Sequence, residues 1–283
     1  MKFSMVIGTL NRPLAIQSCI ESIKLQSYTD YEIIIIDQSD DNSTEKYICF
    51  LNDPKIIYRH VNYKGLSKAR NEGLILASGD YFCLIDDDAY YDEDYLLNAM
   101  KNIETKQILS GYILDTITNS AFVDYKERNN QKILSVREIM KTCPSAGLVI
   151  PMSLIKEVGK FDDKFGLGGK FPAGEETDLL LRGINAGYTV KYVKEMQLKH
   201  PYPVIRKEQV LDYGKIASYY KGIGALYKKN LINNSLFELR FSYFETWMKL
   251  IVKRFCFFKY DREQIEQYIN EFKQGFDNYS IHS

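Results

Sequence analysis

Three consecutive aspartates, Asp86–Asp88, directly follow the apolar run Tyr81–Ile85. Three carboxylates at a partly buried strand end repel one another, and a divalent cation with oxygen ligands compensates that charge well. The pattern therefore indicates a metal site at the end of a buried strand. Because aspartate is also common in turns and at helix N-caps, ordinary turn chemistry, with Asp92 or Asp94 opening the next helix, is the alternative interpretation.

Strand-like apolar runs alternate with segments of helical spacing around these aspartates. Such alternation favours an α/β fold with a mostly parallel central sheet flanked by helices. The Ile-rich run Glu32–Ile36 lacks polar alternation, which indicates that both faces of its strand are covered. Strands are expected over Phe3–Ile7, Glu32–Ile36, Ile56–Arg59, Tyr81–Ile85 and Ser145–Ile150, and helices over Leu14–Leu25 and Ala69–Ala77.

Polar clusters stand at the ends of three of the predicted strands. In a parallel sheet, the loops at the carboxyl ends of the strands form the ligand crevice. We therefore expect these side chains to share one edge of the sheet. They are Thr9, Asn11 and Arg12, then Asp37 and Ser39, then Asp86, Asp87 and Asp88.

A second group of carboxylates opens a predicted helix at Gly174–Arg182. Glu175, Glu176 and Asp178 lie in its first turn, after a glycine-rich stretch. Acidic residues at this position also stabilise a helix through its dipole, so a purely structural role is the alternative to a functional one.

Charge and composition narrow the class of protein. The 283 residues contain 37 Lys and Arg against 37 Asp and Glu, which gives no reason to expect nucleic acid as the main partner. The five cysteines are odd in number and widely spaced, which favours reduced thiols in a cytoplasmic protein. A signal peptide and a membrane-spanning segment are not expected. The protein is expected to be soluble or to lie on a membrane surface.

The segment 236–260 carries one apolar stripe at helical spacing. Basic residues accompany it, and Tyr243 and Trp247 are expected to broaden its apolar side. Such a helix can lie in an anionic bilayer surface. It can equally pack against the rest of the chain or against a second subunit. The stripe comprises Phe237, Phe241, Phe244, Met248, Ile251, Phe255 and Phe258, and the basic residues are Arg240, Lys249, Lys253, Arg254 and Lys259.

Taken together, these motifs make the chain resemble the family 2 glycosyltransferases of GT-A fold over about residues 3–202. The resemblance is to those members that build bacterial capsule, O-antigen and wall polysaccharides. Six segments carry the resemblance, in the order that the family has them. They are Thr9–Pro13, Asp37–Ser39, Gly65–Gly73, Ser78–Tyr81 leading into Asp86–Asp88, Gly174–Asp178, and His200–Pro201.

The resemblance implies a Rossmann-like GT-A fold followed by a helical extension. The catalytic domain would span residues 1–202, with nucleotide-sugar binding over about 1–110 and acceptor binding over about 111–202. Within the second part, the loop Gly166–Ala173 is expected to shape the acceptor site. Residues 203–283 would form a basic, aromatic helical region.

The resemblance also implies a nucleoside diphosphate-sugar donor, with a UDP-sugar as the expected type, and a bound Mn²⁺ or Mg²⁺. Asp88, Asp86 and His200 match the metal-binding positions, and an imidazole ligand favours Mn²⁺. A histidine beside a proline at a surface turn is the alternative for His200. Donor-binding positions match Thr9, Asn11, Arg12, Asp37, Ser39, Arg70, Asp86 and Asp87.

A general base must accept the proton of the attacking acceptor hydroxyl. In the family this role usually falls to the aspartate of a Glu-Asp pair, and that position is Glu176 here. The change adds a methylene group without changing the charge. Glu175 and Asp178 are the alternative bases. A single base with no carboxylate nucleophile implies direct displacement with inversion at the anomeric carbon.

The resulting hypothesis is a metal-dependent, inverting glycosyltransferase that transfers sugar to a glycan acceptor, expected to be lipid-linked, at the inner face of the cell membrane. Two alternatives stay open. The departure at Glu176 is also compatible with a catalytically inactive protein that binds nucleotide sugars within a membrane glycan assembly complex. A protein acceptor is compatible with the sequence as well. Membrane contact or homodimerisation would use the segment 236–260.

Overall fold

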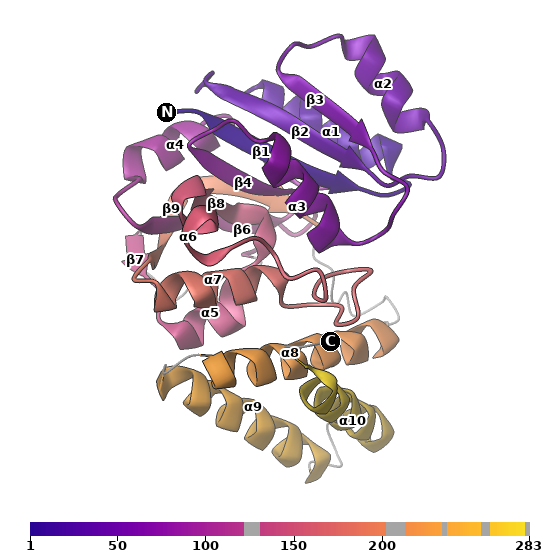
Figure 1. Cartoon of the computed structure of the whole chain (residues 1–283), viewed down its shortest axis with the longest axis vertical. Helices are drawn as coiled ribbons and strands as arrows, with labels where there is room; N and C mark the ends of the chain where they lie inside the picture. Colours follow the sequence, from indigo (N-terminus) through magenta and orange to yellow (C-terminus); the bar gives the residue numbers. More distant parts are fainter. Residues whose placement is uncertain (122–130, 202–212, 234–236, 256–260, 281–283) are drawn as a thin grey trace.

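A single mixed sheet with helices on both faces forms the upper part of the molecule, and three C-terminal helices lie below it (Figure 1). The computed structural model describes residues 1–121, 131–201, 213–233, 237–255 and 261–280. The strand order is β3-β2-β1-β4-β8-β6-β9-β5, and β7 pairs with β9. The strands are β1 (Phe3–Thr9), β2 (Tyr31–Asp37), β3 (Ile56–His60), β4 (Tyr81–Asp86), β5 (Tyr90–Tyr91), β6 (Gln107–Asp115), β7 (Gln131–Ile133), β8 (Leu148–Pro151) and β9 (Thr189–His200).

The N-terminal half of the sheet is parallel, as the alternating pattern predicts. Strands β3, β2, β1 and β4 run in one direction, and β2 is buried along its whole length. Beyond β4 the sheet is mixed, because β8 runs antiparallel to both β4 and β6. The predicted strand over Ser145–Ile150 is wrong in its first half. Ser145–Gly147 forms a 3₁₀ turn (η1), and this turn brings Gly147 against Gly111 of β6 before β8 begins.

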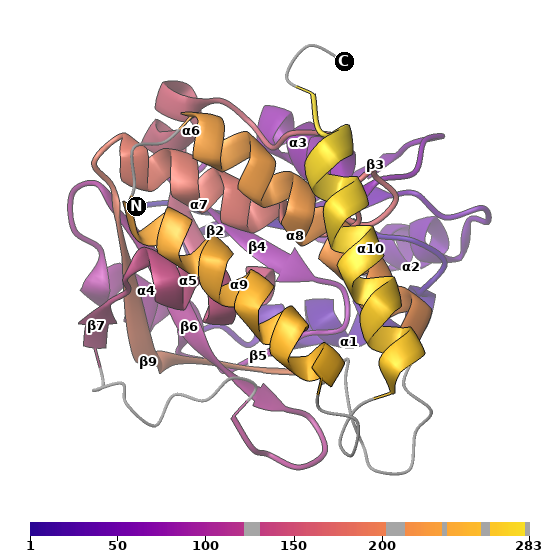
Figure 2. The ribbon, with the colours of Figure 1, turned by 90° about the horizontal axis from the view of Figure 1, so that it is seen from below.

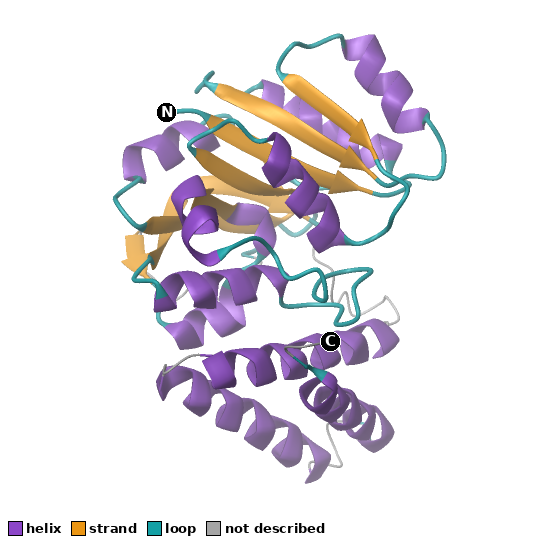
Figure 3. Cartoon of the chain, viewed as in Figure 1, coloured by secondary structure: helices purple, strands orange, loops and turns teal. Residues whose placement is uncertain are grey.

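Helices cover both faces of the sheet and are coloured purple in Figure 3. One core lies between the sheet and α1, α2 and α4, and the other between the sheet and α3, α5, α6 and α7. Gly73 allows α3 to approach β1, because a Cβ there would come within 2.3 Å of Val6. These helices are α1 (Pro13–Lys24), α2 (Ser43–Leu51), α3 (Leu66–Leu76), α4 (Tyr95–Asn102), α5 (Val136–Thr142), α6 (Met152–Val158) and α7 (Glu175–Asn185).

The C-terminal helices α8 (Tyr213–Asn233), α9 (Phe237–Phe255) and α10 (Arg262–Asn278) share a third core with the loop Phe165–Phe171. Seen from below, they lie in front of the rest of the ribbon (Figure 2). The predicted amphipathic helix is therefore confirmed as α9.

The expectation that Tyr243 and Trp247 broaden the apolar stripe of α9 is wrong. Both side chains point toward α10, where their rings pack against Phe272 with centroids 6.0 and 5.2 Å away. Phe258 and Lys259 of the predicted helix lie outside the described residues.

Four of the cysteines, Cys19, Cys49, Cys83 and Cys143, are free thiols in the structure. Among the helices of the described segments, none combines the length and apolar character that crossing a bilayer requires.

Candidate active site

The polar residues that follow β1, β2 and β4 meet at one edge of the sheet, as predicted. The strand register sets this arrangement, since Thr9 lies opposite Asp37 and Gly8 lies opposite Asp86. The Thr9 hydroxyl donates a hydrogen bond of 2.7 Å to Asp87. The carboxyl ends of three parallel strands thus assemble one polar site.

The loops after β1 and β2 are held together through Asn11. Its backbone N–H donates to Ser39 Oγ at 2.8 Å, and its side-chain amide donates to Asp40 at 2.7 Å. Asn11 adopts a left-handed conformation with φ of 55°, which asparagine tolerates better than most residues. Asp37 is fully buried and accepts hydrogen bonds from Ser39 N–H and from the hydroxyl of Tyr58, both at 2.9 Å. Sequence reasoning did not identify Tyr58.

Asp87 and Asp88 are bridged by the guanidinium of Arg12. Its Nη1 lies 2.6 Å from Asp87 Oδ1 and its Nη2 lies 2.6 Å from Asp88 Oδ2. Burial raises the pKa of Asp87 to about 6, although the hydrogen bond from Thr9 and the charge of Arg12 favour ionisation. Burial acts on Asp88 too, but the hydrogen bonds from His200 and Arg12 outweigh it and hold that pKa well below its usual range. Two neighbouring carboxylates therefore have pKa values shifted in opposite directions.

His200, at the end of β9, faces the same aspartates, so the structure does not place it at an isolated surface turn. Its Nε2 lies 3.1 Å from Asp88 Oδ1 and 3.5 Å from Asp86 Oδ2. Its Nδ1 lies 2.8 Å from the carbonyl oxygen of Pro201. Burial alone would lower the pKa of His200, but the hydrogen bonds that its Nε2–H donates to Asp86 and Asp88 outweigh burial and raise it to about 10.

Asp86, Asp88 and His200, the predicted metal ligands, lie close together at this edge of the sheet. Among the residues that the structure describes, no group of three or more His, Cys, Asp or Glu side chains is arranged to hold a metal ion by itself. Mg²⁺ commonly binds through only one or two carboxylates and takes its other ligands from substrate phosphates and water. Because a carbonyl accepts from His200 Nδ1, its Nε2 is the nitrogen oriented toward the aspartates. The donor set present therefore fits Mg²⁺ or Mn²⁺ completed by a diphosphate.

The buried guanidinium of Arg70 connects the aspartates to the N-terminus of α7. Its Nη2 lies 3.1 Å from Asp86 Oδ1, and its Nη1 lies 2.9 Å from Glu175 Oε1. Glu176 follows on α7 and is half-buried. Burial, and after it the charge of Glu175, raises the pKa of Glu176 above the ordinary value, while Arg70 opposes this shift. Two of the three predicted α7 carboxylates therefore lie beside the aspartate cluster.

Asp178, the third of these carboxylates, binds residues outside the aspartate cluster. It is fully buried and accepts from Arg182 at 2.9 Å, Lys229 at 2.9 Å and Asn230 at 3.2 Å. None of these partners belongs to the Asp86–Asp88 cluster. The contacts join α7 to α8 and give Asp178 a structural role.

Residues outside the predicted set also reach the site. The hydroxyl of Ser145, in η1, lies 3.3 Å from Asp86 Oδ2. Helix α8 approaches from below, because Gly222 lets its backbone pack on Ala173, where a Cβ would come within 2.6 Å of the Ala173 N and O atoms. Burial raises the pKa of Tyr219 on α8, and the charges of Glu175 and Glu176 add to this rise. These contacts depend on the folding of the C-terminal helices, so no local sequence signal indicates them.

The loop Phe165–Phe171, within the predicted acceptor region, lies between α3 and the C-terminal helices. The N–H of Leu66 donates to the carbonyl of Leu167 at 2.8 Å. On its other side, the ring of Tyr279 packs against Phe165 and Phe171 at 5.6 and 5.7 Å. The loop is thus fixed on both sides.

Comparison of sequences places this site within a known family. Residues 4–153 match the model of glycosyl transferase family 2. The uncharacterised glycosyltransferase YwdF of Bacillus subtilis is 27% identical over 174 residues, which are 57% of this chain and 62% of that protein. WfaP of Escherichia coli, a UDP-Glc:alpha-D-GlcNAc-diphosphoundecaprenol beta-1,3-glucosyltransferase, is 34% identical over 38% of this chain and 44% of its own length. The chain thus spans less than two thirds of either relative.

Solved structures show the same fold at low sequence identity. Residues 1–349 of Staphylococcus aureus TarS, in complex with UDP-GlcNAc, match with a TM-score of 0.66 and 16% identity, covering 98% of this chain and 82% of that one. The mannosyltransferase PcManGT of Pyrobaculum calidifontis, in complex with GDP-Man and Mn²⁺, matches with a TM-score of 0.67 and 13% identity, covering 99% and 76%. The fold is that of the GT-A glycosyltransferases.

Proposed function

Because the chain belongs to glycosyl transferase family 2, we propose that it is a metal-dependent, inverting enzyme that transfers a sugar from a nucleoside diphosphate-sugar to a lipid-linked glycan acceptor of a surface polysaccharide. The observation that carries this proposal is the buried Arg70, which pairs with Asp86 at the end of β4 and with Glu175 in the first turn of α7. Leaving-group stabilisation and proton removal thereby come together at a single edge of the sheet.

The donor side of the site is the edge formed by the loops after β1 and β2. We assign Asp37 as the acceptor for a base N–H, for which its contacts with Ser39 and Tyr58 would have to rearrange. Arg12 supplies positive charge beside the aspartates. The nucleotides bound by TarS and PcManGT, UDP-GlcNAc and GDP-Man, support a nucleoside diphosphate-sugar donor. The printed UDP-Glc specificity of WfaP favours a UDP-sugar.

Asp86, Asp88 and His200 would hold the metal ion, for which the Mn²⁺ in the PcManGT complex gives support. When bound, such an ion neutralises the charge that develops on the departing diphosphate. In this structure, Arg12 and His200 lie 2.6 and 3.1 Å from the carboxylate of Asp88. Their contacts with Asp88 would have to rearrange when the carboxylate takes a metal.

Glu176 is the proposed general base. The acceptor hydroxyl oxygen forms a bond to the anomeric carbon, its proton passes to Glu176, and the bond from that carbon to the diphosphate oxygen breaks. Inversion follows from this single displacement. Glu175 is less suited to the role because Arg70 already holds its carboxylate at 2.9 Å, and Asp178 is bound by Arg182 and Lys229.

Exchange of Glu176 for glutamine tests the assignment. We expect Glu176→Gln to reduce turnover about 10²- to 10⁴-fold, the range typical for loss of a general base. The increase in melting temperature caused by a UDP-sugar with Mn²⁺ should persist, because the donor edge is unchanged. Glu45→Gln, in the first turn of α2, is the matched control and should retain wild-type turnover. Wild-type turnover in Glu176→Gln would refute the base, and absence of any nucleotide- and metal-dependent shift would count against the donor site.

A further inference from the structure

Helix α9 exposes a continuous row of large apolar side chains to solvent. Phe237 is 80% exposed, Phe244 60% and Phe255 65%, although phenylalanine is usually buried. Successive members lie three or four residues apart and therefore occupy one side of the helix. This set, called the α9 face below, comprises Phe237, Phe241, Phe244, Met248, Ile251 and Phe255.

The opposite side of α9 already supplies the contacts that hold the helix in place. Leu239, Ser242 and Leu250 are buried, and Trp247 packs edge-on against Phe272 of α10. The Tyr227 hydroxyl of α8 is 2.9 Å from Ser242 Oγ. The α9 face lies outside these packing contacts, although the guanidinium of Arg137 lies 5.6 Å from the ring centroid of Phe241.

The charges next to the α9 face are predominantly basic. Arg240, Lys249 and Arg254 are exposed beside it, and Arg254 lies 3.3 Å from Glu266 of α10. Glu245 is compensated threefold, since Arg137, Lys141 and Lys249 lie 2.8, 2.7 and 2.8 Å from its carboxylate.

Glu238, the other acidic residue of α9, accepts a hydrogen bond from the backbone N–H of Val136 at 3.1 Å. Five basic residues at and next to α9, Arg240, Lys249, Arg254, Arg137 and Lys141, outnumber the three acidic residues Glu238, Glu245 and Glu266. The net charge around the α9 face is therefore positive, which complements an anionic surface.

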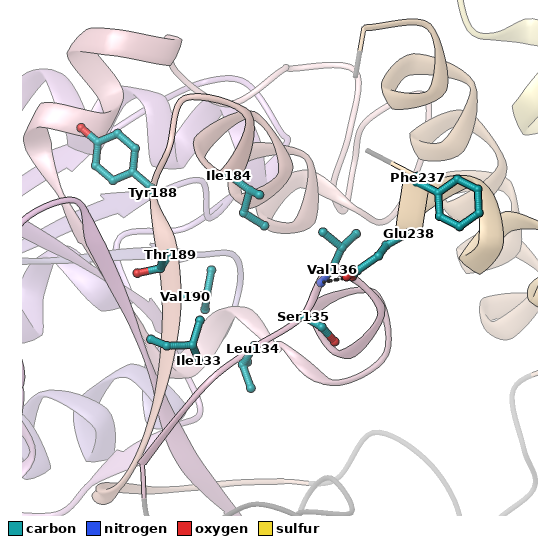
Figure 4. A pocket seen from close by; sticks show the side chains of 10 residues that line it. All are labelled: Ile133, Leu134, Ser135, Val136, Ile184, Tyr188, Thr189, Val190, Phe237 and Glu238. Atoms are coloured by element: carbon teal, nitrogen blue, oxygen red, sulfur yellow. Dashed lines mark hydrogen bonds between the residues drawn. The ribbon is translucent and has the colours of Figure 1, made fainter. Parts of the chain in front are cut away.

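An apolar pocket of about 450 Å³ opens at the N-terminal end of α9 (Figure 4). Ile133, Val136, Ile184 and Val190 line it, and Phe237 stands at its edge. The pocket continues the apolar surface of the α9 face beyond the helix. Its lining suits a hydrocarbon chain better than a polar ligand.

We propose that the α9 face docks this protein onto a lipid bilayer that contains anionic headgroups. Aromatic and aliphatic side chains would enter the boundary between headgroups and acyl chains, with Arg240, Lys249 and Arg254 at headgroup level. A second copy of the chain is a poorer occupant, because a two-fold pairing of the α9 face would bring like-charged arginines and lysines together.

Docking deepens the proposed function, since a lipid-linked acceptor is presented at a bilayer surface. It nevertheless does not depend on sugar transfer. Vesicle binding can be measured without donor, metal or acceptor, so failure of the transfer reaction leaves the docking surface testable, and the reverse also holds.

Flotation with phosphatidylglycerol–phosphatidylcholine vesicles tests the proposal. The wild-type chain should float with these vesicles and bind pure phosphatidylcholine far less, with binding that weakens as salt rises. The triple variant Phe241→Ser, Phe244→Ser, Phe255→Ser should lose at least about tenfold in partitioning, since each exposed ring contributes to burial in the interface. Phe50→Ser on α2, where Phe50 is 84% exposed, is the matched control and should bind as wild type.

Three further measurements make the outcome decisive. Thermal melts establish that the triple variant is folded, and transfer to a water-soluble acceptor should be retained. Asp88→Asn should still float, because the aspartate cluster plays no part in docking. Wild-type protein that fails to float, a triple variant that floats equally well, or a dimer in light scattering that the triple variant abolishes without any vesicle binding would each overturn the proposal.

Discussion

Arg70 and Glu175 form a buried ion pair with 2.9 Å between Nη1 and Oε1, although 105 residues separate them along the chain. Their side chains are 1% and 8% exposed. Through the same guanidinium, Asp86 is joined to α7. The pair therefore connects the strand that carries the aspartates with the helix that carries the proposed base.

Replacement of Arg70 by methionine should destabilise the protein strongly. Glu175 and Asp86 would keep their carboxylates in a poorly solvated site without the guanidinium, and loss of one partner of a buried pair typically costs about 3–5 kcal/mol. Urea denaturation measures the change in the free energy of unfolding. Arg59→Met is the matched control, because the side chains of Arg59 and Glu72 are 43% and 24% exposed, and a pair this accessible to water should contribute only about 0–1 kcal/mol. An equal decrease in the free energy of unfolding in the two variants would contradict the burial of the pair between Arg70 and Glu175.

Glu32 should make the stability of the protein depend on acid pH. Burial would raise its pKa, but hydrogen bonds from Lys2, Ser4 and Ser78 outweigh burial and lower the pKa from 4.5 to about 2. Because the folded-state pKa is the lower one, the stabilisation is present above pH 4.5 and is lost as the pH falls toward about 2.

The variant Glu32→Gln should therefore be less stable than wild type at neutral pH, and the difference should shrink through this acid range. Chemical denaturation at a series of pH values gives the two curves. Glu93→Gln, at an exposed position in the turn before α4, should follow the wild-type curve. A Glu32→Gln curve parallel to that of wild type would show that the carboxylate has no such effect.

Lys229 joins α8 to α7 and to the segment that follows α6. Its ammonium lies 2.8 Å from Asp162 and 2.9 Å from the buried Asp178. Lys229→Met should lower the free energy of unfolding by about 2–4 kcal/mol, since Asp178 keeps Arg182 but loses part of its compensation. The neighbouring Lys228→Met removes only a cation–π contact of 4.9 Å with Phe276 and should cost about 0.5–1 kcal/mol in the same urea titration. A similar decrease in the free energy of unfolding in both variants would argue against a buried ion pair between Lys229 and Asp178.

Local sequence patterns were sufficient to predict the site residues of the parallel half-sheet. Each strand there is an apolar run followed at once by polar residues, so Thr9, Asp37 and Asp86 could be placed at one edge before any contact was known. The strand register then confirms that they meet. The helix that begins at Glu175 was similarly predicted from its acidic first turn and apolar spacing.

Local sequence patterns could not predict the contacts between segments that are distant along the chain. The sequence offers Glu175 and Asp178 as alternatives to Glu176, and only the packing of α8 brings Lys229 against Asp178. Periodicity identified α9 as amphipathic but could not distinguish its packed side from its exposed side. Tyr243 and Trp247 fit the apolar side in the sequence pattern, but in the structure they belong to the packed side, where their rings contact α10.

The packing of Tyr279 on Phe165 and Phe171 has a consequence for local opening of the molecule. The amide hydrogens of Gly166 and Phe171 close the loop through bonds of 2.9 and 2.8 Å, and the ring that covers this loop directly follows α10. Segments that share such contacts tend to open as one cooperative unit. Native-state hydrogen exchange should therefore show these two amides losing protection together with the last turn of α10. The loop beside the site would then open at the same rate as the end of the C-terminal helices.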